Sequence, residues 1–425
     1  MKNYVFLFAL IFSFAALSDA FSQEAAPAKD DVQSEQTIQP NQNLPIEAFN
    51  IEGLKRTKRS YMDSLLSEYM HKSASEKTLK AIETLLQAQN LFDQIKVSAR
   101  PLGNNEAQVD ISFKEKWSVL PFPVGYYTGD SYAAGLFIMD VNSLGQHCMT
   151  TVGGIYSSSG IMGAGAFQKP PAQKGKIGFT VSGSVSKSKR EFANAKNYKV
   201  FEYENFFTGI KTGLLFKPLS FMAASVGIGY SFFNPIDSPN VQRRNQWSAN
   251  ASCKVSSSSW NGFFLSVNSL SLGGEFLFSD VSSQIFAQAI TASGQVQQPI
   301  ASRLRLMSGA RGFFSNNLLK TNYAGKMESG VSILPNAFRT DQVFGFYTGF
   351  EAAVVKVNFG MLSVYALYEV AVAKDWNKSF YACHGPEAGV RLYLAKLAFP
   401  AFSMGASYNI DENRFAYSFS GGASF

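Results

Sequence analysis

The side chains that most often supply nucleophiles, general bases and metal ligands are few in this sequence. They are three histidines and three cysteines, namely His71, His147, His384, Cys148, Cys253 and Cys383. No histidine has a Ser, Cys or acidic partner at a recognisable spacing, and the cysteines are odd in number without metal-ligand spacing. The sequence also has no glycine-rich phosphate loop and no Gly-x-Ser-x-Gly elbow. We therefore expect no enzymatic activity, no cofactor and no metal site.

Two glutamates interrupt segments in which large apolar residues alternate with other residues. In 343–357, Glu351 lies on the face opposite the phenylalanines, and in 360–373, Glu369 lies opposite the large apolar residues. If these segments are strands of a membrane barrel, both carboxylates point into the lumen, because a charge facing lipid at mid-depth would cost roughly 2–4 kcal/mol. Four arginines share the parity of lumen positions on their own segments: Arg303, Arg305, Arg311 and Arg391.

The chain begins with the features of a secretory signal peptide. Lys2 is followed by an apolar run from 5 to 17 and by small residues, so we expect residues 1–22 to be removed. The run is too short to cross a bilayer as a helix, and an uncleaved membrane anchor is the less favoured alternative. Residues 23–43 are polar and are predicted to form a disordered linker.

Charge is scarce in the sequence as a whole. Only 16% of the residues are charged, whereas a soluble domain usually has about 25%. The chain is nevertheless rich in Phe, Tyr and Gly, and these features together favour a membrane β-barrel over a soluble barrel or sandwich. The net charge of +7 is spread along the chain without a basic stripe, so we do not expect nucleic-acid binding.

Residues 44–117 have a compact pattern that differs from the rest of the chain. The predicted order is strand, helix, helix, strand, strand, with strands at 46–51, 95–97 and 109–113. The first helix is expected at 60–70, and Ser73 or Ser75 is expected to cap the second. Two helices on one face of a small mixed sheet predict an α+β domain.

Residues 118–425 predict an all-β membrane barrel of about 16 antiparallel strands. Segments of alternating residues recur there between Gly, Asn, Ser and Pro turns. The predicted strands are 118–127, 131–141, 146–156, 159–169, 175–187, 206–216, 219–232, 245–256, 261–277, 282–294, 301–314, 343–357, 360–373, 379–395, 398–409 and 412–425. An even number of strands is the rule for single-chain bacterial barrels.

The first and last of these strands would meet at the seam that closes the barrel. The lipid-facing residues predicted for the last strand include Phe415, Tyr417, Phe419 and Phe425. The first strand contains Pro121 and Pro123, which cannot donate hydrogen bonds to a ladder. We therefore expect the closing pair of strands to be short and weak.

Three stretches of the α+β segment match the pattern of a known domain family in order. They are FNIEGLKRTKRSYM at 49–62, SEKTLKAIETLLQAQNLFDQIKV at 75–97 and VDISFKEKW at 109–117. In these stretches Gly53 precedes a basic pair, and Glu115-Lys116 closes the pattern. The segment 44–117 resembles the POTRA (polypeptide-transport-associated) domain, and this resemblance implies a location in the periplasm.

The remainder of the chain also carries recognisable stretches. They are DVNSLGQ at 140–146, GFYTGFEAAV at 345–354, LYEVAV at 367–372 and GPEAGVRLYL at 385–394. They are similar to the strands of the BamA/TamA-type surface-antigen barrel of bacterial outer membranes. The resemblance covers most of residues 44–425.

A long loop of that family folds back into the lumen, where an Arg followed by Gly and an aromatic residue contacts acidic residues of the wall. The corresponding segment here is 315–342, and its nearest match is Phe338-Arg339-Thr340-Asp341, which keeps the Arg but not its neighbours. The resemblance implies that Arg339 latches the loop onto Glu351 and Glu369 by charge-assisted hydrogen bonds. The alternative is that these carboxylates pair with lumen arginines.

The resemblance implies assembly or insertion of outer-membrane proteins through a lateral seam between the first and last strands. The partners would be unfolded outer-membrane or secreted polypeptides, outer-membrane lipids, and periplasmic chaperones or lipoproteins. Two alternatives remain open. One is translocation of a specific polypeptide or lipid across the outer membrane, and the other is a structural surface barrel without insertase activity.

Overall fold

The computed structural model describes residues 44–421, apart from 90, 104, 129–130, 172–174, 195, 197, 237–240, 262–263, 318–328, 336, 358–359, 376–378 and 395–400. The predicted signal peptide (1–22) and linker (23–43) lie outside the described residues, as does Phe425. No helix in the described ranges is long and apolar enough to cross a membrane.

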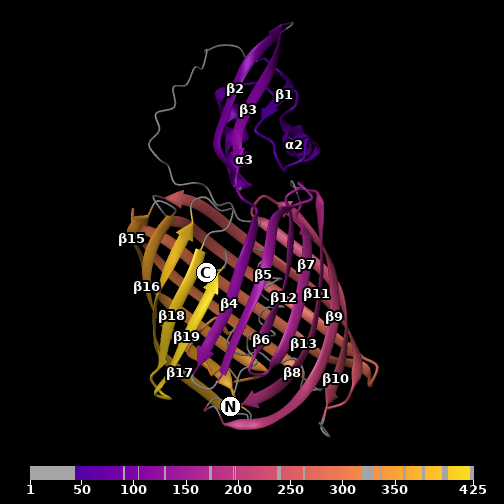
Figure 1. Ribbon diagram of the computed structural model, residues 1–425, viewed down its shortest axis with the longest axis vertical. Helices are drawn as coiled ribbons and strands as arrows, with labels where there is room; N and C mark the ends of the chain where they lie inside the picture. Colours follow the sequence, from indigo (N-terminus) through magenta and orange to yellow (C-terminus); the bar gives the residue numbers. More distant parts are fainter. Residues whose placement is uncertain are drawn as a thin grey trace.

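The first part of the described chain is a small α+β domain, which we call the N-terminal domain (Figure 1). Its sheet has the order β1-β3-β2, with β1 parallel and β2 antiparallel to the central strand β3. The elements are β1 (Ile46–Glu52), α2 (Arg59–Leu66), the 3-10 turn η1 (Ser67–Tyr69), α3 (Glu76–Ala88), β2 (Phe92–Gly103) and β3 (Glu106–Glu115). The predicted order of strands and helices is confirmed.

Local signals explain where α3 begins and which faces the two helices bury. Ser75 is the N-cap of α3, and its hydroxyl accepts a hydrogen bond from the Thr78 N–H. The buried residues of α2 and α3 recur at helical spacing and lie against β1 and β3 in one core. The largest fully buried side chains of this core are Ile46, Met62, Leu65, Leu66, Ile82, Leu86, Phe92 and Ile111.

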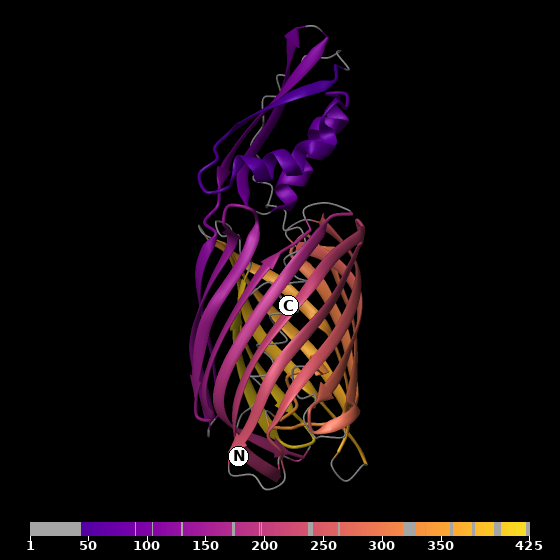
Figure 2. The ribbon, with the colours of Figure 1, turned by 90° about the vertical axis from the view of Figure 1, so that its right-hand side faces the viewer.

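The second part is a barrel of sixteen strands, in which each strand pairs antiparallel with the next (Figures 1 and 2). The strands are β4 (Val119–Thr128), β5 (Ser131–Ser143), β6 (Cys148–Ser157), β7 (Gly160–Lys169), β8 (Ile177–Ala193), β9 (Lys199–Leu219), β10 (Met222–Ile236), β11 (Arg244–Asn261), β12 (Phe264–Ser279), β13 (Ser282–Ala301), β14 (Leu304–Asn317), β15 (Gln342–Val357), β16 (Gly360–Lys374), β17 (Phe380–Leu394), β18 (Ala401–Asn409) and β19 (Arg414–Gly421). Each corresponds to one predicted strand.

Burial alternates along the strands as the sequence parity predicts. In β16, Glu369 is buried, whereas its neighbours Tyr368 and Val370 are exposed on the outside. Large apolar side chains such as Ile228 and Leu270 are likewise exposed on the outer surface. The outside of the barrel is therefore an apolar belt, and the polar positions face inward.

Several strands extend beyond their predicted ends. The strand predicted at 206–216 spans Lys199–Leu219, and the strand predicted at 282–294 spans Ser282–Ala301. Most residues added at the start of β9 are charged or aromatic, and they pair in register with the end of β8. A polar strand that projects from the apolar belt lacks the hydrophobic alternation on which the prediction depended.

The N-terminal domain lies against one end of the barrel (Figure 2). Its core continues into the first barrel strands through four buried side chains, Leu120, Met139, Val141 and Met149. Arg56 forms an ion pair with Asp140 at 2.9 Å, and the Lys58 N–H donates to the Gly145 carbonyl at 2.8 Å. We call the opposite end of the barrel the far end.

Candidate functional site

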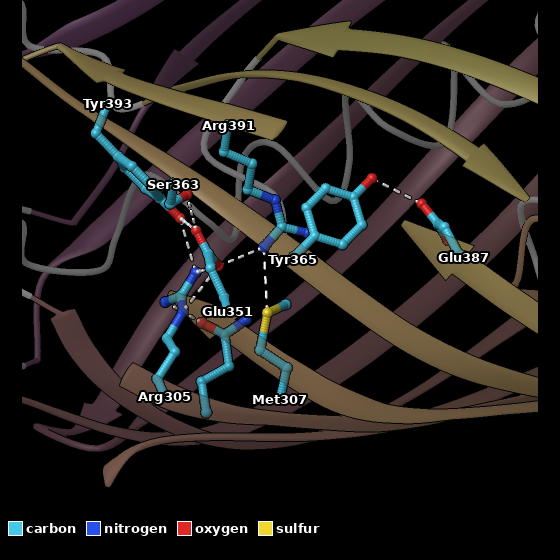
Figure 3. A network of polar contacts seen from close by, with 9 residues as sticks. Arg305, Met307, Glu351, Ser363, Tyr365, Glu387, Arg391 and Tyr393 are labelled. Atoms are coloured by element: carbon cyan, nitrogen blue, oxygen red, sulfur yellow. Dashed lines mark hydrogen bonds and ion pairs between the residues drawn. The ribbon is translucent and has the colours of Figure 1, made fainter. Parts of the chain in front are cut away.

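The most deeply buried charge of the barrel is Glu351 on β15, whose side chain is 0% exposed (Figure 3). Its Oε2 accepts hydrogen bonds from Arg305 Nη2 and from Arg391 Nη1, both at 2.6 Å. Ser363 Oγ and Tyr393 Oη donate to the other carboxylate oxygen. We call this group of one carboxylate and two guanidinium groups the lumen cluster. Both oxygens of its carboxylate accept hydrogen bonds.

Four adjacent strands position the lumen cluster. Arg305 on β14 is the registered partner of Glu351 on β15, and Ser363 on β16 is the registered partner of Arg391 on β17. The parity of each strand turns these side chains inward, and the short distance between neighbouring strands brings them together. The cluster thus connects four strands of the wall at one height.

A segment of the chain runs inside the barrel beside this wall. We call residues 329–341 the inner loop. Its apolar side chains Val331, Ile333 and Leu334 are buried in a cluster with Phe313 and Val343 of the wall. A Cβ at Gly345 would lie 2.1 Å from a backbone oxygen of the inner loop, so glycine permits the close approach of loop and wall. The inner loop occupies part of the lumen.

Glu369 on β16 holds the inner loop through its backbone. Its carboxylate accepts hydrogen bonds from the Ser332 N–H at 2.9 and 3.0 Å and from the Ile333 N–H at 3.2 Å. Ser332 Oγ donates to Glu369 at 2.8 Å and also lies 2.9 Å from a carboxylate oxygen of Glu387. A carboxylate that accepts several bonds from one loop segment is a strong local anchor.

Arg339 lies elsewhere on the inner loop. Its guanidinium donates to the carbonyl of Phe338 at 2.6 Å, and its backbone N–H donates to the Ala193 carbonyl at 3.4 Å. Phe338 and Ala193 form a parallel bridge, so this part of the loop attaches to the end of β8. The contacts described for Glu351 agree with the alternative of pairing with lumen arginines. Those described for Glu369 are with the backbone of Ser332 and Ile333 and with the Ser332 hydroxyl.

The four predicted lumen arginines lie in three different surroundings. Arg305 and Arg391 belong to the lumen cluster. Arg311 has lumen parity, and its side chain lies where a Cβ at Gly330 of the inner loop would be. Arg303 does not belong with them, because it lies exposed in the turn between β13 and β14. Its inward orientation was inferred from a predicted strand at 301–314, but in the structure this strand begins at Leu304, so Arg303 precedes it.

The seam between β19 and β4 is the shortest ladder of the barrel as described. It has one registered pair, Phe419 with Gly125, whereas β18 and β19 share eight pairs. Phe415 and Tyr417 are exposed, as expected of lipid-facing positions. The seam is thus as short as the sequence predicts.

Pro121 and Pro123 lie on β4 with their side chains exposed, opposite Ile138 and Leu136 of β5. Neither residue has an N–H to give to a ladder.

Sequence reasoning missed some of the groups that complete the site. Ser363 and Tyr393 share the lumen parity of predicted strands, so their orientation was available, but their partners depend on the register between strands. Ser332 lies in a loop without periodicity, and no pattern indicated that its backbone N–H faces Glu369. Pairing across strands is the information that one sequence lacks.

Comparison with solved structures identifies the fold. BamA from Haemophilus ducreyi lacking POTRA domains 1–3 is similar with a TM-score of 0.56 and 13% identity, over 91% of this chain and 86% of that one. CdiB from Acinetobacter baumannii gives a TM-score of 0.62 at 13% identity, over 88% and 73% of the two chains. CdiB from Escherichia coli gives 0.57 at 11%, over 97% and 96%.

These likenesses span both the N-terminal domain and the barrel, so the chain has the fold of the BamA-type barrels. No family model and no curated relative matches the sequence.

Proposed function

We propose that this chain is an outer-membrane barrel of the BamA/TamA type that assists the insertion of other outer-membrane proteins through its lateral seam. The N-terminal domain acts as a POTRA domain in the periplasm. The apolar belt of exposed side chains faces lipid, with residues such as Ile228 and Leu272 at its surface. The fold shared with BamA supports the same reading of the barrel.

Among the described residues, the seam has one registered pair, and this is the observation that carries the proposal. A strand edge that is barely paired offers free N–H and C=O groups, and these groups template the addition of another strand. Opening the seam would break few hydrogen bonds, whereas opening β11 from β12 would break a ladder of sixteen registered pairs. A client strand can therefore enter the sheet at the seam at the lowest cost.

The N-terminal domain offers a second place for an extended polypeptide. β1 and β2 are both edge strands of its sheet, and the exposed half of β2 runs from Ser98 to Gly103. The domain contacts β4 to β6 and so adjoins the first barrel strand, while the exposed half of β2 lies at the end of the sheet away from the barrel (Figure 1). This arrangement favours unfolded outer-membrane polypeptides as the partners.

The inner loop favours insertion at the seam over passage through the lumen. It packs on the wall through its apolar side chains, and Glu369 anchors its backbone. Translocation through the barrel would require these contacts to break. Depletion separates the possibilities in cells: a fall in many outer-membrane proteins indicates insertion, loss of one secreted partner indicates translocation, and neither indicates a structural barrel.

A disulfide across the seam tests the mechanism directly. Gly125→Cys and Phe419→Cys place two thiols at the registered pair in a protein whose three native cysteines are replaced. In liposomes, we expect the oxidised protein to lose insertion of an unfolded barrel client and the reduced protein to regain it.

The matched control is the Ser225→Cys and Ser252→Cys pair on β10 and β11, which is also in register. This lock should leave insertion unchanged. Full activity of the locked seam would refute the lateral mechanism.

A further inference from the structure

Buried polar side chains gather at the far end of the barrel on strands β8 to β11. Arg244, the first residue of β11, is 2% exposed, and Tyr203 on β9 is 3% exposed. Ser186 and Ser188 of β8 are buried on the same inward face. These four side chains are remote from the lumen cluster, which lies on β14 to β17.

Each of these four side chains has polar atoms without a hydrogen-bond partner. Arg244 Nη1 donates to the Gln242 carbonyl at 3.1 Å, but Nε and Nη2 have no partner. The hydroxyls of Tyr203, Ser186 and Ser188 have none either. Buried polar groups are paired in the great majority of cases, and an unpaired guanidinium edge is especially costly. These four side chains can therefore donate hydrogen bonds to the acceptor atoms of a ligand.

The strand register brings these residues together. Ser186, Phe207, Phe233 and Arg244 form one row of registered partners across β8 to β11. Tyr203 packs edge-on against the Phe233 ring with a centroid distance of 6.0 Å. The phenolic hydroxyl and the guanidinium of Arg244 thus share one aromatic neighbour.

The charge of the cluster selects the ligand. The guanidinium carbon of Arg244 lies 4.1 Å from the Phe233 ring centroid, and that of Arg190 lies 5.4 Å from the same centroid. Asp280 attracts Arg244 electrostatically, but its carboxylate is exposed and accepts hydrogen bonds from Asn245. Two guanidinium groups over one buried ring give the cluster a basic character, which favours an anionic ligand.

We infer that this cluster is a binding site for a phosphate-type oxyanion. Arg244 would bind two of its oxygens through Nε and Nη2, in the forked geometry that guanidinium groups use for phosphate. Tyr203 would donate to another oxygen, and Arg190 would add charge. A tetrahedral anion has enough acceptor oxygens for the guanidinium edge and the hydroxyls together, whereas a carboxylate has two. The source is free phosphate or a phosphorylated lipid headgroup.

Binding to the purified, folded barrel tests the inference. Inorganic phosphate and, separately, phosphatidic acid in mixed micelles are titrated against the wild-type protein and the Arg244→Gln variant by calorimetry. We expect Arg244→Gln to weaken binding at least about tenfold, because a charge-assisted bidentate contact is lost. Tyr203→Phe should weaken it less, since only one hydroxyl is removed.

Arg243→Gln is the matched control. Arg243 adjoins Arg244, and its substitution removes the same single charge. The Arg243 side chain, however, is exposed over Phe232. This variant should bind as the wild-type protein does. Binding of inorganic phosphate that depends on Arg244 assigns the site to a free oxyanion, and binding of phosphatidic acid alone assigns it to a lipid.

The inference is overturned if neither probe binds, or if Arg243→Gln and Arg244→Gln weaken binding equally. A heat-modifiability gel confirms that each variant is a folded barrel before titration. If Arg244→Gln does not fold, Tyr203→Phe decides: a phosphate affinity equal to that of the wild-type protein contradicts the site.

Discussion

Glu351 shows how much one buried carboxylate does for a barrel wall. It holds two buried guanidinium groups that would otherwise be like charges at close range. Parity alone placed Glu351, Arg305 and Arg391 in the lumen. Parity could not choose among the arginines, because the choice depends on which residues face one another across strands.

Replacing Glu351 should therefore weaken the barrel more than its single side chain suggests. We expect Glu351→Gln to cost about 3–5 kcal/mol, because it leaves two buried guanidinium groups without their anion. The measurement is the temperature at which the folded barrel converts to the unfolded form on a heat-modifiability gel.

Glu275→Gln serves as the control for this change. Glu275 pairs with Lys211 inside the barrel at 2.8 Å, but the lysine side chain is 40% exposed. Loss of such a pair should cost at most about 1 kcal/mol. Equal shifts for the two variants would contradict the special role of Glu351.

Glu115 makes a comparable anchor in the N-terminal domain. Partial burial raises the pKa of its carboxyl, but the N–H donors of Arg56, Lys55 and Thr57 outweigh burial and hold the pKa below its usual value of 4.5. A carboxylate with a lowered pKa in the folded state stabilises the fold above the unfolded pKa. This stabilisation is lost as the pH falls through the folded value.

We therefore expect the N-terminal domain to lose stability as the pH falls below about 4.5. Glu115→Gln should cost about 1–3 kcal/mol at pH 7 and remove this part of the pH dependence. Amide exchange of β1 and β3 in the intact protein measures both effects. Glu52→Gln changes an exposed carboxylate of the same domain and should do neither; an unchanged pH profile for Glu115→Gln would refute the anchor.

The number and order of the elements could be predicted from the sequence, as could the antiparallel direction of the barrel strands. All sixteen barrel strands, and the three strands and two α-helices of the N-terminal domain, correspond to predicted ones, since period-2 and period-3.6 patterns are local properties. Strand ends were less predictable where β9 and β13 leave the apolar belt and lose the alternation. The contact between the N-terminal domain and the turn after β5 was not predicted, because it joins two elements with separate patterns.

That turn contains a glycine which the contact requires. Gly145 has φ +65°, and a Cβ there would lie 2.1 Å from the Arg56 carbonyl oxygen. Gly145→Ala should therefore loosen the N-terminal domain from the barrel, and limited proteolysis between Trp117 and Leu120 should become faster. Gly175→Ala is the matched control, because Gly175 also has a positive φ of +77° but open space around it. Equal proteolysis rates for the two variants would show that the contact is unimportant.

At the scale of the whole molecule, the wall is uneven in how firmly its strands are paired. Among the described residues, the ladder between β11 and β12 has sixteen registered pairs, β17 and β18 share seven, and the seam has one. The two prolines of the first strand predicted a short closure. The lengths of the other ladders could not be predicted in the same way, since ladder length depends on both partners.

Hydrogen exchange should report this gradient. We expect the amides of β19 and β4 to exchange before those of β11 and β12 in the folded protein, because few hydrogen bonds protect them. Mass spectrometry of peptides from each strand measures the order. Strand β18, which lies between the seam and the firmer wall, should exchange at an intermediate rate. Uniform protection around the barrel would contradict the weak seam.

The core shared by the N-terminal domain and the first barrel strands has a consequence for how the chain folds. Leu120, Met139 and Val141 join residues that are close in sequence, so this unit needs few long-range encounters. The pair of Phe419 with Gly125 is instead a contact between opposite ends of the barrel sequence. Because distant contacts cost the most loop entropy, the docked N-terminal unit forms early and the ring closes last. The opening of the seam proposed above would then reverse the final step of folding.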